Sequence, residues 1–294
     1  MIICPDCHKD IDLSYKCNTC NWKLTHHHGI SSFLSKTDMA DMTFQKYIQN
    51  YDEISDDDLA ESIQDIDYIR YQTHKFHSYL GSIQNKNVCE VGIGKGLLFD
   101  MLIENTPKNL VGIDISVPYL KKYNDIMRHK NDVNVILANA ENIPYRNEFD
   151  LVVAADILEH VFNVGDFLYS VRRSLKDTGV FVVRTPYDEN INIYSKFAGC
   201  KYDFVHLRNF SKRSLKTVLE GAGFQVIKFH FDGFYSYKKR KLFKLNKYID
   251  YLFEKCMKMK YHDPHHVTKI SNALGKFLMK PSEVVAVCRK INTA

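Results

Sequence analysis

The segment DILEH, residues 156 to 160, places two carboxyl groups and an imidazole within five residues. It follows an apolar run, FDLVVAA, which is typical of a buried strand. If the segment were helical, spacings of i, i+3 and i+4 would direct the three side chains to one side. A second imidazole, His206, precedes a predicted helix whose cap is Ser211. Because an imidazole with a pKa near neutrality can act as a general base, these groups are candidates for catalysis. The candidate catalytic residues are Asp156, Glu159, His160 and His206.

Four cysteines near the start of the chain form two CxxC pairs separated by nine residues, and they are Cys4, Cys7, Cys17 and Cys20. Each pair can direct two sulfurs toward one ion, and four protein ligands leave no open position for a substrate. A redox-active CxxC pair is the alternative, but no βαβ pattern precedes these pairs. We therefore predict a structural zinc ribbon over residues 1–34.

The segment VCEVGIGKGLLFD, residues 88–100, joins an apolar run to an acid and then to three glycines. This order predicts a strand, a tight turn and the start of a helix. The next predicted strand, LVGID, ends in Asp114, 24 residues after Glu90. A carboxylate there can accept hydrogen bonds from ribose hydroxyls, so the pattern predicts a nucleotide-sized ligand at the carboxyl ends of parallel strands. The candidate binding residues are Glu90, Gly92, Gly94, Gly96, Asp114 and Ile115.

The elements that would position these residues alternate between strands and helices, which predicts an α/β fold. Further strands are expected within 134–145, 149–161, 179–185, 224–231 and 283–289. In this order and spacing, the segments between roughly 85 and 230 resemble class I S-adenosylmethionine-dependent methyltransferases. The resemblance implies a Rossmann-like seven-stranded sheet with an antiparallel last strand, and S-adenosylmethionine as the cofactor.

The loop Asn139-Ala140-Glu141 resembles the adenine-contacting loop of the same family, which implies that Asn139 and Ala140 bind the cofactor. The family more usually has Asp at the position of Asn139, although an amide still offers a donor and an acceptor. A dinucleotide-binding dehydrogenase is the competing interpretation. Against it, the glycines run G-x-G-x-G and lack the wider final gap of the dinucleotide pattern.

The LEHV-like element also resembles that of ubiquinone-pathway O-methyltransferases, in which acids and histidines at matching positions are associated with a divalent cation. The implied ligand set is Asp156, Glu159, His160 and His206. A cation there could lower the pKa of an acceptor hydroxyl. The element is also widespread in family members without a metal, and then His160 or His206 would act directly as the base.

Residues 35–84 are predicted to form helices that act as a lid, because apolar and aromatic residues recur at helical spacing. Similar helices cover the cofactor in the family, which makes Tyr51 a candidate cofactor contact. The stretch from Asp52 to Asp67 holds eight acids and no base. It would repel nucleic acid, although a solvated helix face is the simpler interpretation.

Residues 85–294 are assigned to the methyltransferase-like domain, with an insertion at 233–282 in its closing hairpin. Residues 238–260 of the insertion mix nine basic residues with apolar ones. Such a basic amphipathic helix could contact a membrane surface or an anionic substrate, but a lid helix with solvated lysines is the simpler interpretation.

The chain has 294 residues, 45% hydrophobic and 26% charged, enough for one α/β domain with smaller additions. No run reaches the roughly 18 apolar residues of a membrane-spanning helix, so we expect a cytoplasmic protein. The formal charge of +5 is too mild to indicate a nucleic-acid partner.

The leading hypothesis is an O-methyltransferase, or else an N-methyltransferase, that acts on a small molecule or a glycan intermediate of a biosynthetic pathway. One alternative is an RNA or protein methyltransferase that uses the ribbon for recognition. Another is a non-catalytic, cofactor-binding partner subunit. The sequence determines neither the acceptor nor the oligomeric state.

Overall fold

The computed structural model describes residues 1–294 apart from 13, 61–65, 234–246, 249–280 and 292–294. Most of the predicted insertion at 233–282 lies outside the described residues, and so does almost all of its basic amphipathic segment. The predicted membrane contact through that segment therefore stays a prediction. Among the described helices, none has the length and hydrophobicity needed to cross a membrane.

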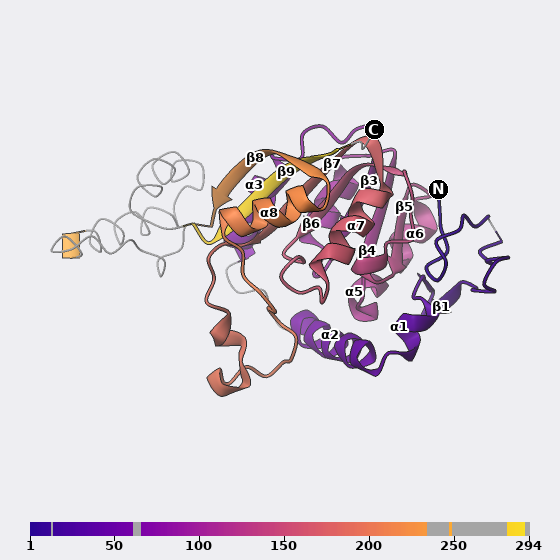
Figure 1. Cartoon of the computed structure of the whole chain (residues 1–294), viewed down its shortest axis with the longest axis horizontal. Helices are drawn as coiled ribbons and strands as arrows, with labels where there is room; N and C mark the ends of the chain where they lie inside the picture. The colour runs from indigo at the N-terminus through magenta and orange to yellow at the C-terminus, as the bar shows by residue number, and fades with distance from the viewer. Residues whose placement is uncertain (13, 61–65, 234–246, 249–280, 292–294) are drawn as a thin grey trace.

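The centre of the structure is one sheet with strand order β1-β2-β5-β4-β3-β6-β7-β9-β8 (Figure 1). Strands β5, β4, β3, β6 and β7 run parallel, and β9 is antiparallel to both of its neighbours. This arrangement confirms the predicted α/β fold and its antiparallel last strand. The strands are β1 (Thr25–His27), β2 (Ile30–Ser32), β3 (Asn87–Val91), β4 (Asn109–Asp114), β5 (Val133–Leu137), β6 (Phe149–Ala155), β7 (Leu175–Pro186), β8 (Phe224–Asp232) and β9 (Glu283–Lys290).

The described part of the sheet has nine strands, so the prediction of seven was wrong in number. The two additional strands come from the N-terminal segment, in which β1 and β2 form a hairpin. Strand β2 pairs in parallel with β5, at Ser31 with Ile136 and Ser32 with Leu137. Without this pairing, β5 would present unpaired backbone groups at the sheet edge.

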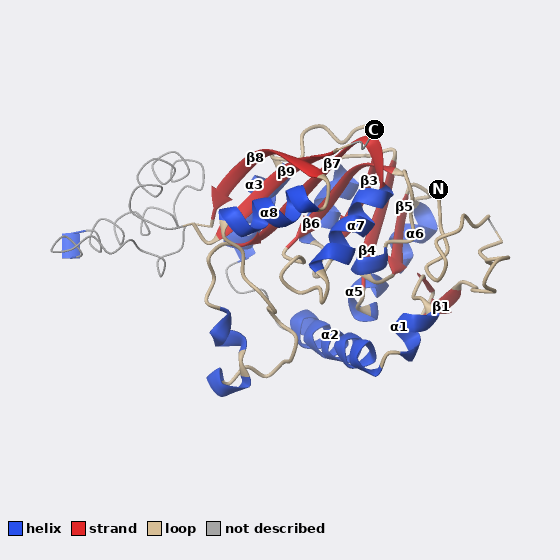
Figure 2. Ribbon diagram, viewed as in Figure 1, coloured by secondary structure: helices blue, strands red, loops and turns tan. Residues whose placement is uncertain are grey.

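Helices cover both faces of the sheet (Figure 2). Buried side chains of α7 and α8 belong to one hydrophobic cluster, and those of α3, α4 and α5 belong to a second. Helix α8 begins at the predicted cap, where Ser211 and Ser214 form a reciprocal capping box. The helices are α1 (Lys36–Ala40), α2 (Met42–Ala60), α3 (Ile66–His77), α4 (Leu97–Glu104), α5 (Val117–Lys121), α6 (Asn124–His129), α7 (Val164–Ser174) and α8 (Lys212–Gly221), with 3-10 turns at η1 (Ala140–Asn142), η2 (Ile191–Tyr194) and η3 (Lys196–Ala198).

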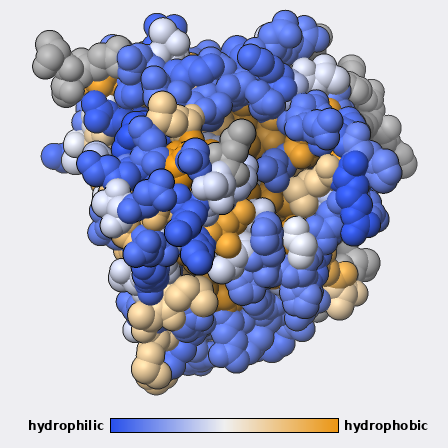
Figure 3. Space-filling model, turned by 90° about the vertical axis from the view of Figure 1, so that its right-hand side faces the viewer, coloured by the Kyte–Doolittle hydropathy of each residue, from blue (hydrophilic) through white to orange (hydrophobic). Residues whose placement is uncertain are grey.

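The cysteine-bearing segment packs on the loop that follows β5. The backbone N–H of Ile3 donates to the carbonyl of Pro144 at 3.0 Å, and the amide of Asn142 donates to the carbonyl of Pro5 at 2.7 Å. Trp22 is buried, stacks on Phe33 with ring centroids 5.7 Å apart, and belongs to the same hydrophobic cluster as the residues of β5 and β6. On the face that carries this segment, hydrophobic residues appear mainly in recesses between hydrophilic ones (Figure 3).

Gly112 of β4 offers a test of the packing between the sheet and α4. A Cβ atom at this position would lie 2.3 Å from Cδ1 of Ile93 and 2.7 Å from the ring of Phe99. We expect Gly112→Ala to lower the free energy of unfolding by about 1–3 kcal/mol because the core is already filled. The matched control is Gly221→Ala, since a Cβ at Gly221 meets no atom within 4 Å. It should be neutral or stabilising by up to about 1 kcal/mol. Urea denaturation of both variants measures the difference, and equal stabilities would contradict the packing.

Candidate active site

A cavity of about 220 Å³ lies at the carboxyl ends of the central parallel strands. Helix α2 covers it, and in Figure 1 this helix runs across the edge of the sheet beside α5. Of the residues predicted from the sequence, those that line the cavity are Tyr51, Gly92, Gly94, Asp114, Ile115, Asn139, Ala140, Asp156 and His160. Glu90, Gly96, Glu159 and His206 are not among its lining residues.

The turn after β3 is held by the carboxylate of Asp114 at the end of β4. The backbone N–H of Gly94 donates to one of its oxygens at 3.0 Å, and that of Ser116 donates to the other at 2.9 Å. Gly94 has a φ of 53°, which favours glycine. Gly96 is needed for close packing, because a Cβ there would lie 1.9 Å from the hydroxyl oxygen of Tyr123. Burial raises the pKa of Asp114.

Glu90 lies in β3 with 1% of its surface exposed. Its Oε2 atom has no hydrogen-bond partner among the described residues, and burial raises its pKa well above the usual range. An unpartnered buried carboxyl oxygen is costly, and Glu90 stands two residues before Gly92 of the glycine turn, although it is not among the residues that line the cavity.

The side chain of Asn139 is held by the protein on both sides. Its amide donates to Asp38 at 2.9 Å, and its oxygen accepts from the backbone N–H of Glu141 at 2.9 Å. The second N–H and the second lone pair of this amide can still form hydrogen bonds, so the predicted contact with an adenine is compatible with this arrangement. The amide now links α1 to the loop after β5.

Glu159, His160 and His206 come together beside the cavity, and of the three only His160 lines it; one ligand-type atom of each lies within 4.8 Å of the others. Residues 156–160 form a turn and not a helix, so the helical spacing considered above does not apply. The backbone N–H of His160 donates to the carbonyl of Ile157 at 3.0 Å within this turn. The three side chains converge because the turn after β6 lies against the loop that carries His206, where the N–H of Leu207 donates to the carbonyl of Glu159 at 3.0 Å.

Hydrogen bonds to Nδ1 orient both imidazoles. The hydroxyl oxygen of Tyr51 lies 2.7 Å from Nδ1 of His160 and 3.1 Å from the carbonyl oxygen of Phe204. The hydroxyl can donate to either acceptor, so this contact orients the ring of His160 without fixing which of its nitrogens carries the hydrogen. Burial, together with the nearby His206, lowers the pKa of His160 to about 4, so the ring is neutral near pH 7.

Glu159 is fully buried and accepts a hydrogen bond from Thr185 at 2.9 Å through Oε2. Its Oε1 lies 3.9 Å from Nε2 of His160 and has no hydrogen-bond partner among the described residues. Burial raises the pKa of Glu159 well above the usual range. A cation placed beside Oε1 would compensate the cost of this buried carboxylate.

Asp156 lies outside this three-residue cluster, although the sequence predicted it as a fourth ligand. Its carboxylate accepts from Nε of Arg184 at 3.0 Å and from a second guanidinium nitrogen of the same residue. Asp156 has a φ of 54°, in the left-handed region, where the chain leaves β6 and enters the turn.

Two residues that were not predicted from the sequence also shape this region. Glu189 accepts a hydrogen bond from Nδ1 of His206 at 2.5 Å. Arg208 donates to the carbonyl of Phe162 at 3.0 Å and to that of Val161, which holds the end of the turn after β6. Arg208 could have been found through its place in HLRNFS, whereas no motif marks Glu189.

Acids of the lid helix α2 are bonded to its neighbours, so the interpretation of a simply solvated face is incomplete. Asp52 accepts from the backbone N–H of Val117 at 3.2 Å, and Asp58 accepts from the hydroxyl of Tyr119 at 2.7 Å. Asp57 accepts from Lys201 and Tyr202 on the opposite side. These bonds fix α2 between α5 and the loop that precedes α8.

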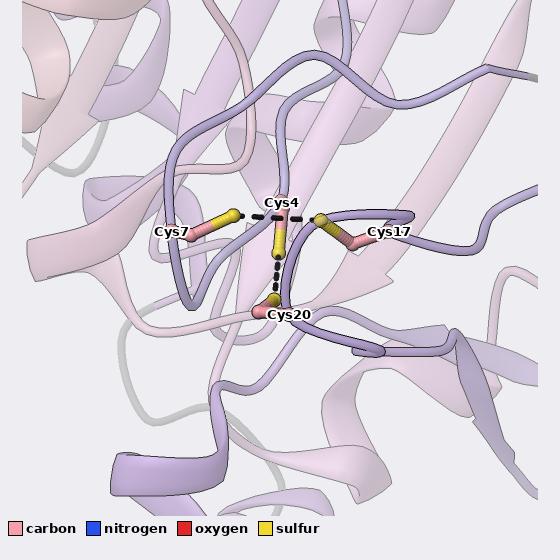
Figure 4. A group of neighbouring side chains, drawn as sticks. All are labelled: Cys4, Cys7, Cys17 and Cys20. Atoms are coloured by element: carbon pink, nitrogen blue, oxygen red, sulfur yellow. Dashed lines mark hydrogen bonds between the residues drawn. The ribbon is translucent and has the colours of Figure 1, made fainter.

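The four N-terminal cysteines point toward one another (Figure 4). The Sγ atoms of Cys4 and Cys20 lie 3.4 Å apart, and those of Cys7 and Cys17 also lie 3.4 Å apart. No disulfide joins them, and all four sulfurs lie within 4.8 Å of one another. Zn–S bonds of about 2.3 Å in a tetrahedron place sulfurs about 3.8 Å apart, so this donor set fits one zinc ion.

A family model described as a methyltransferase domain matches residues 55–228. The chain belongs to this methyltransferase-domain family. The chain also resembles one chain of the complex between the Haloferax volcanii Trm112 methyltransferase activator and a methyltransferase. The TM-score is 0.54 at 12% identity, over 77% of this chain and 92% of that chain, which shows a shared fold.

Among curated relatives of this chain is a tRNA U34 carboxymethyltransferase of Pseudoalteromonas atlantica, 27% identical over 45% of this chain and 42% of the relative. Another is a ubiquinone biosynthesis O-methyltransferase of Rhodopseudomonas palustris, 30% identical over 36% of this chain and 42% of the relative. The chain thus spans less than half the length of these two relatives. Their names point to two different classes of acceptor.

The cysteine cluster predicts one zinc per chain. We expect Cys4→Ser to lose this zinc because one of the four sulfur ligands is removed. Because zinc binding stabilises the folded state of such a segment, the melting temperature of the variant should also fall. The control is Cys200→Ser, since Cys200 lies outside the cluster. Elemental analysis of both purified variants gives the answer, and a full zinc content in Cys4→Ser would refute the assignment.

Asp114 is expected to be needed for cofactor binding. Asp114→Asn removes a buried charge that bonds two backbone N–H groups. Loss of charge-assisted bonds worth about 1.5–3 kcal/mol corresponds to about 10- to 150-fold weaker binding of S-adenosylmethionine. Titration calorimetry measures this, with the exposed Asp125→Asn as a control that should bind like the unaltered protein. Unchanged affinity in Asp114→Asn would exclude the proposed role.

Proposed function

We propose that this methyltransferase transfers the methyl group of S-adenosylmethionine to a hydroxyl oxygen of a small acceptor. The observation that carries the proposal is the cluster of Glu159, His160 and His206, which adjoins the cavity through His160. Each neutral imidazole offers one nitrogen lone pair, and Oε1 of Glu159 has no hydrogen-bond partner among the described residues. Such a site can receive a hydroxyl proton or a cation.

The cofactor would occupy the part of the cavity formed by the turn after β3 and by Asp114. The Asp114 carboxylate is suited to ribose hydroxyls, and the unpartnered oxygen of Glu90 could receive a further donor. Tyr51 and Tyr47 of α2 line the opposite wall, where their rings lie 4.7 Å apart. These groups would position the sulfonium and exclude water, which is the main requirement of an in-line displacement.

A small acceptor is favoured by the way the lid is fastened. Hydrogen bonds fix α2 to α5 on one side and to the loop before α8 on the other, for example between Asn50 and the backbone N–H of Asp203 at 3.0 Å. A polymer would need an open groove across this edge of the sheet. A small molecule needs only a brief opening of the lid.

The cluster also fits a divalent cation. One carboxylate oxygen and two imidazole Nε2 atoms form a suitable donor set, and partners on Nδ1 orient metal-binding histidines in general. A cation bound there would lower the pKa of an acceptor hydroxyl. In its absence, Nε2 of His206 would accept the hydroxyl proton. In either case the oxygen forms the new bond to the methyl carbon, and the sulfur retains the electron pair of the broken bond.

An RNA methyltransferase is the second candidate. The tRNA-modifying relative, the similarity to a chain of the Trm112 complex and the cysteine cluster favour it. The acids of α2 beside the cavity oppose it, because they would repel phosphates. The non-catalytic partner subunit is distinguished from both enzymes by cofactor binding without turnover.

We expect the purified protein to contain zinc and a second divalent metal, and to methylate catechol-like acceptors in preference to bulk tRNA. His206→Ala should lose the second metal and about 10²–10⁴-fold of the activity, because it removes a ligand or a base. Asp156→Ala should retain that metal, because Asp156 bonds Arg184 and not the cluster. Elemental analysis and transfer of a labelled methyl group measure both.

The outcomes separate the mechanisms. Activity without the second metal, but still dependent on His206, would indicate that the histidine acts as the base. Methylation of tRNA that weakens steeply with salt would favour the second candidate. Tight binding of S-adenosylmethionine with no turnover on either acceptor would overturn the proposed function.

A further inference from the structure

Glu189 lies in the loop between β7 and α8 and is fixed at three points. Its Oε1 accepts from the hydroxyl of Tyr194 at 2.8 Å, and its Oε2 lies 2.5 Å from Nδ1 of His206. Its carbonyl accepts from the amide of Asn209 at 2.7 Å. A side chain held in this way has little freedom to leave His206.

The contact between Glu189 and His206 is shielded from water. The side chain of His206 is 13% exposed and that of Glu189 is 18% exposed. The ring of Tyr194 packs on the imidazole of His206 with ring centroids 4.2 Å apart. The ring of His160 also contacts this imidazole, with ring centroids 4.7 Å apart. The imidazole is therefore restrained in rotation as well as in position.

We propose that Glu189 is a positioning residue that keeps the proton of His206 on Nδ1 and thereby directs the lone pair of Nε2 into the cluster with Glu159 and His160. A carboxylate can only accept, so the nitrogen that faces Glu189 must carry the hydrogen. The remaining nitrogen, Nε2, is then the atom that can bind a cation or accept the acceptor's proton. Tyr51 contacts His160 through the same ring nitrogen, Nδ1.

This proposal rests on the proposed function for its catalytic consequence, but the tautomer itself does not depend on any substrate. Long-range ¹⁵N–¹H correlation spectra of the ¹⁵N-histidine-labelled protein distinguish a protonated Nδ1 from a protonated Nε2. We expect His206 in the unaltered protein to carry its proton on Nδ1. A proton on Nε2 would overturn the proposal even if methyl transfer is confirmed.

Two substitutions of Glu189 separate its acceptor oxygen from its volume. Glu189→Leu keeps the approximate size and removes the acceptor, so Nδ1 should lose its preferential protonation. Glu189→Gln keeps an amide oxygen that can accept from Nδ1, so the tautomer should be retained. The matched control is the neighbouring Asp188→Asn. Asp188 has a φ of 46°, which Asn tolerates, and its backbone N–H bonds the carbonyl of Phe210.

If methyl transfer is established, kcat should fall by about 10- to 100-fold in Glu189→Leu, the usual cost of losing such an orienting partner. KM for S-adenosylmethionine should stay unchanged, because Glu189 is not among the residues that line the cavity. Glu189→Gln should recover most of the loss. An unchanged His206 tautomer in Glu189→Leu, or a loss in Asp188→Asn equal to that in Glu189→Leu, would refute the positioning role. Failure of all variants to turn over, with the tautomers as expected, would count against the proposed function alone.

Discussion

The site depends on one buried carboxylate, that of Asp114. Its two oxygens receive the backbone N–H groups of Gly94 and Ser116, so it joins the turn after β3 to the turn after β4. Parallel strands end at a common edge, and each turn there would otherwise leave polar backbone groups without partners. The hydrogen bonds of Asp114 satisfy two of them and also define the floor of the cavity. The remaining walls are placed relative to this floor.

The lid and the cysteine module meet this floor through short polar contacts. Asn139 joins the loop after β5 to Asp38 of α1, and Asn142 joins the same loop to Pro5. On the other side, Tyr51 of α2 contacts both His160 and the carbonyl of Phe204. The cavity is therefore enclosed by segments from distant parts of the chain. Each of them contributes directional bonds in addition to buried apolar side chains, such as Trp22 of the cysteine module and Phe44 of α2.

Much of the fold could be predicted from the sequence, because buried parallel strands appear as short apolar runs with glycines and acids at their ends. The apolar runs that end in Glu90-Val91 and in Asp114 were sufficient to predict strands β3 and β4 and the glycine turn after β3. The N-terminal hairpin was missed because THH and ISS carry no apolar period, and their pairing with β5 is a tertiary contact. The residues of the hairpin do not indicate that β2 pairs with β5.

The candidate site could be predicted only in part. His160 and Glu159 stand in a recognisable motif, and His206 stands near another, so their types and places were visible. The pairing of Asp156 with Arg184 was not, because it depends on the neighbouring position of β6 and β7. Glu189 was invisible for the same reason, since a single acid in a loop resembles any solvated acid.

The parallel pairing of β2 with β5 has a consequence for biosynthesis. Cys4 to Cys20 lie close in sequence and can gather around an ion as soon as they leave the ribosome. Ser31, however, pairs with Ile136, about a hundred residues further along the chain. The hairpin must wait for that partner, and closing so long a loop is slow compared with local folding. The hairpin of β1 and β2 thus completes its structure only after the middle of the sheet has been made.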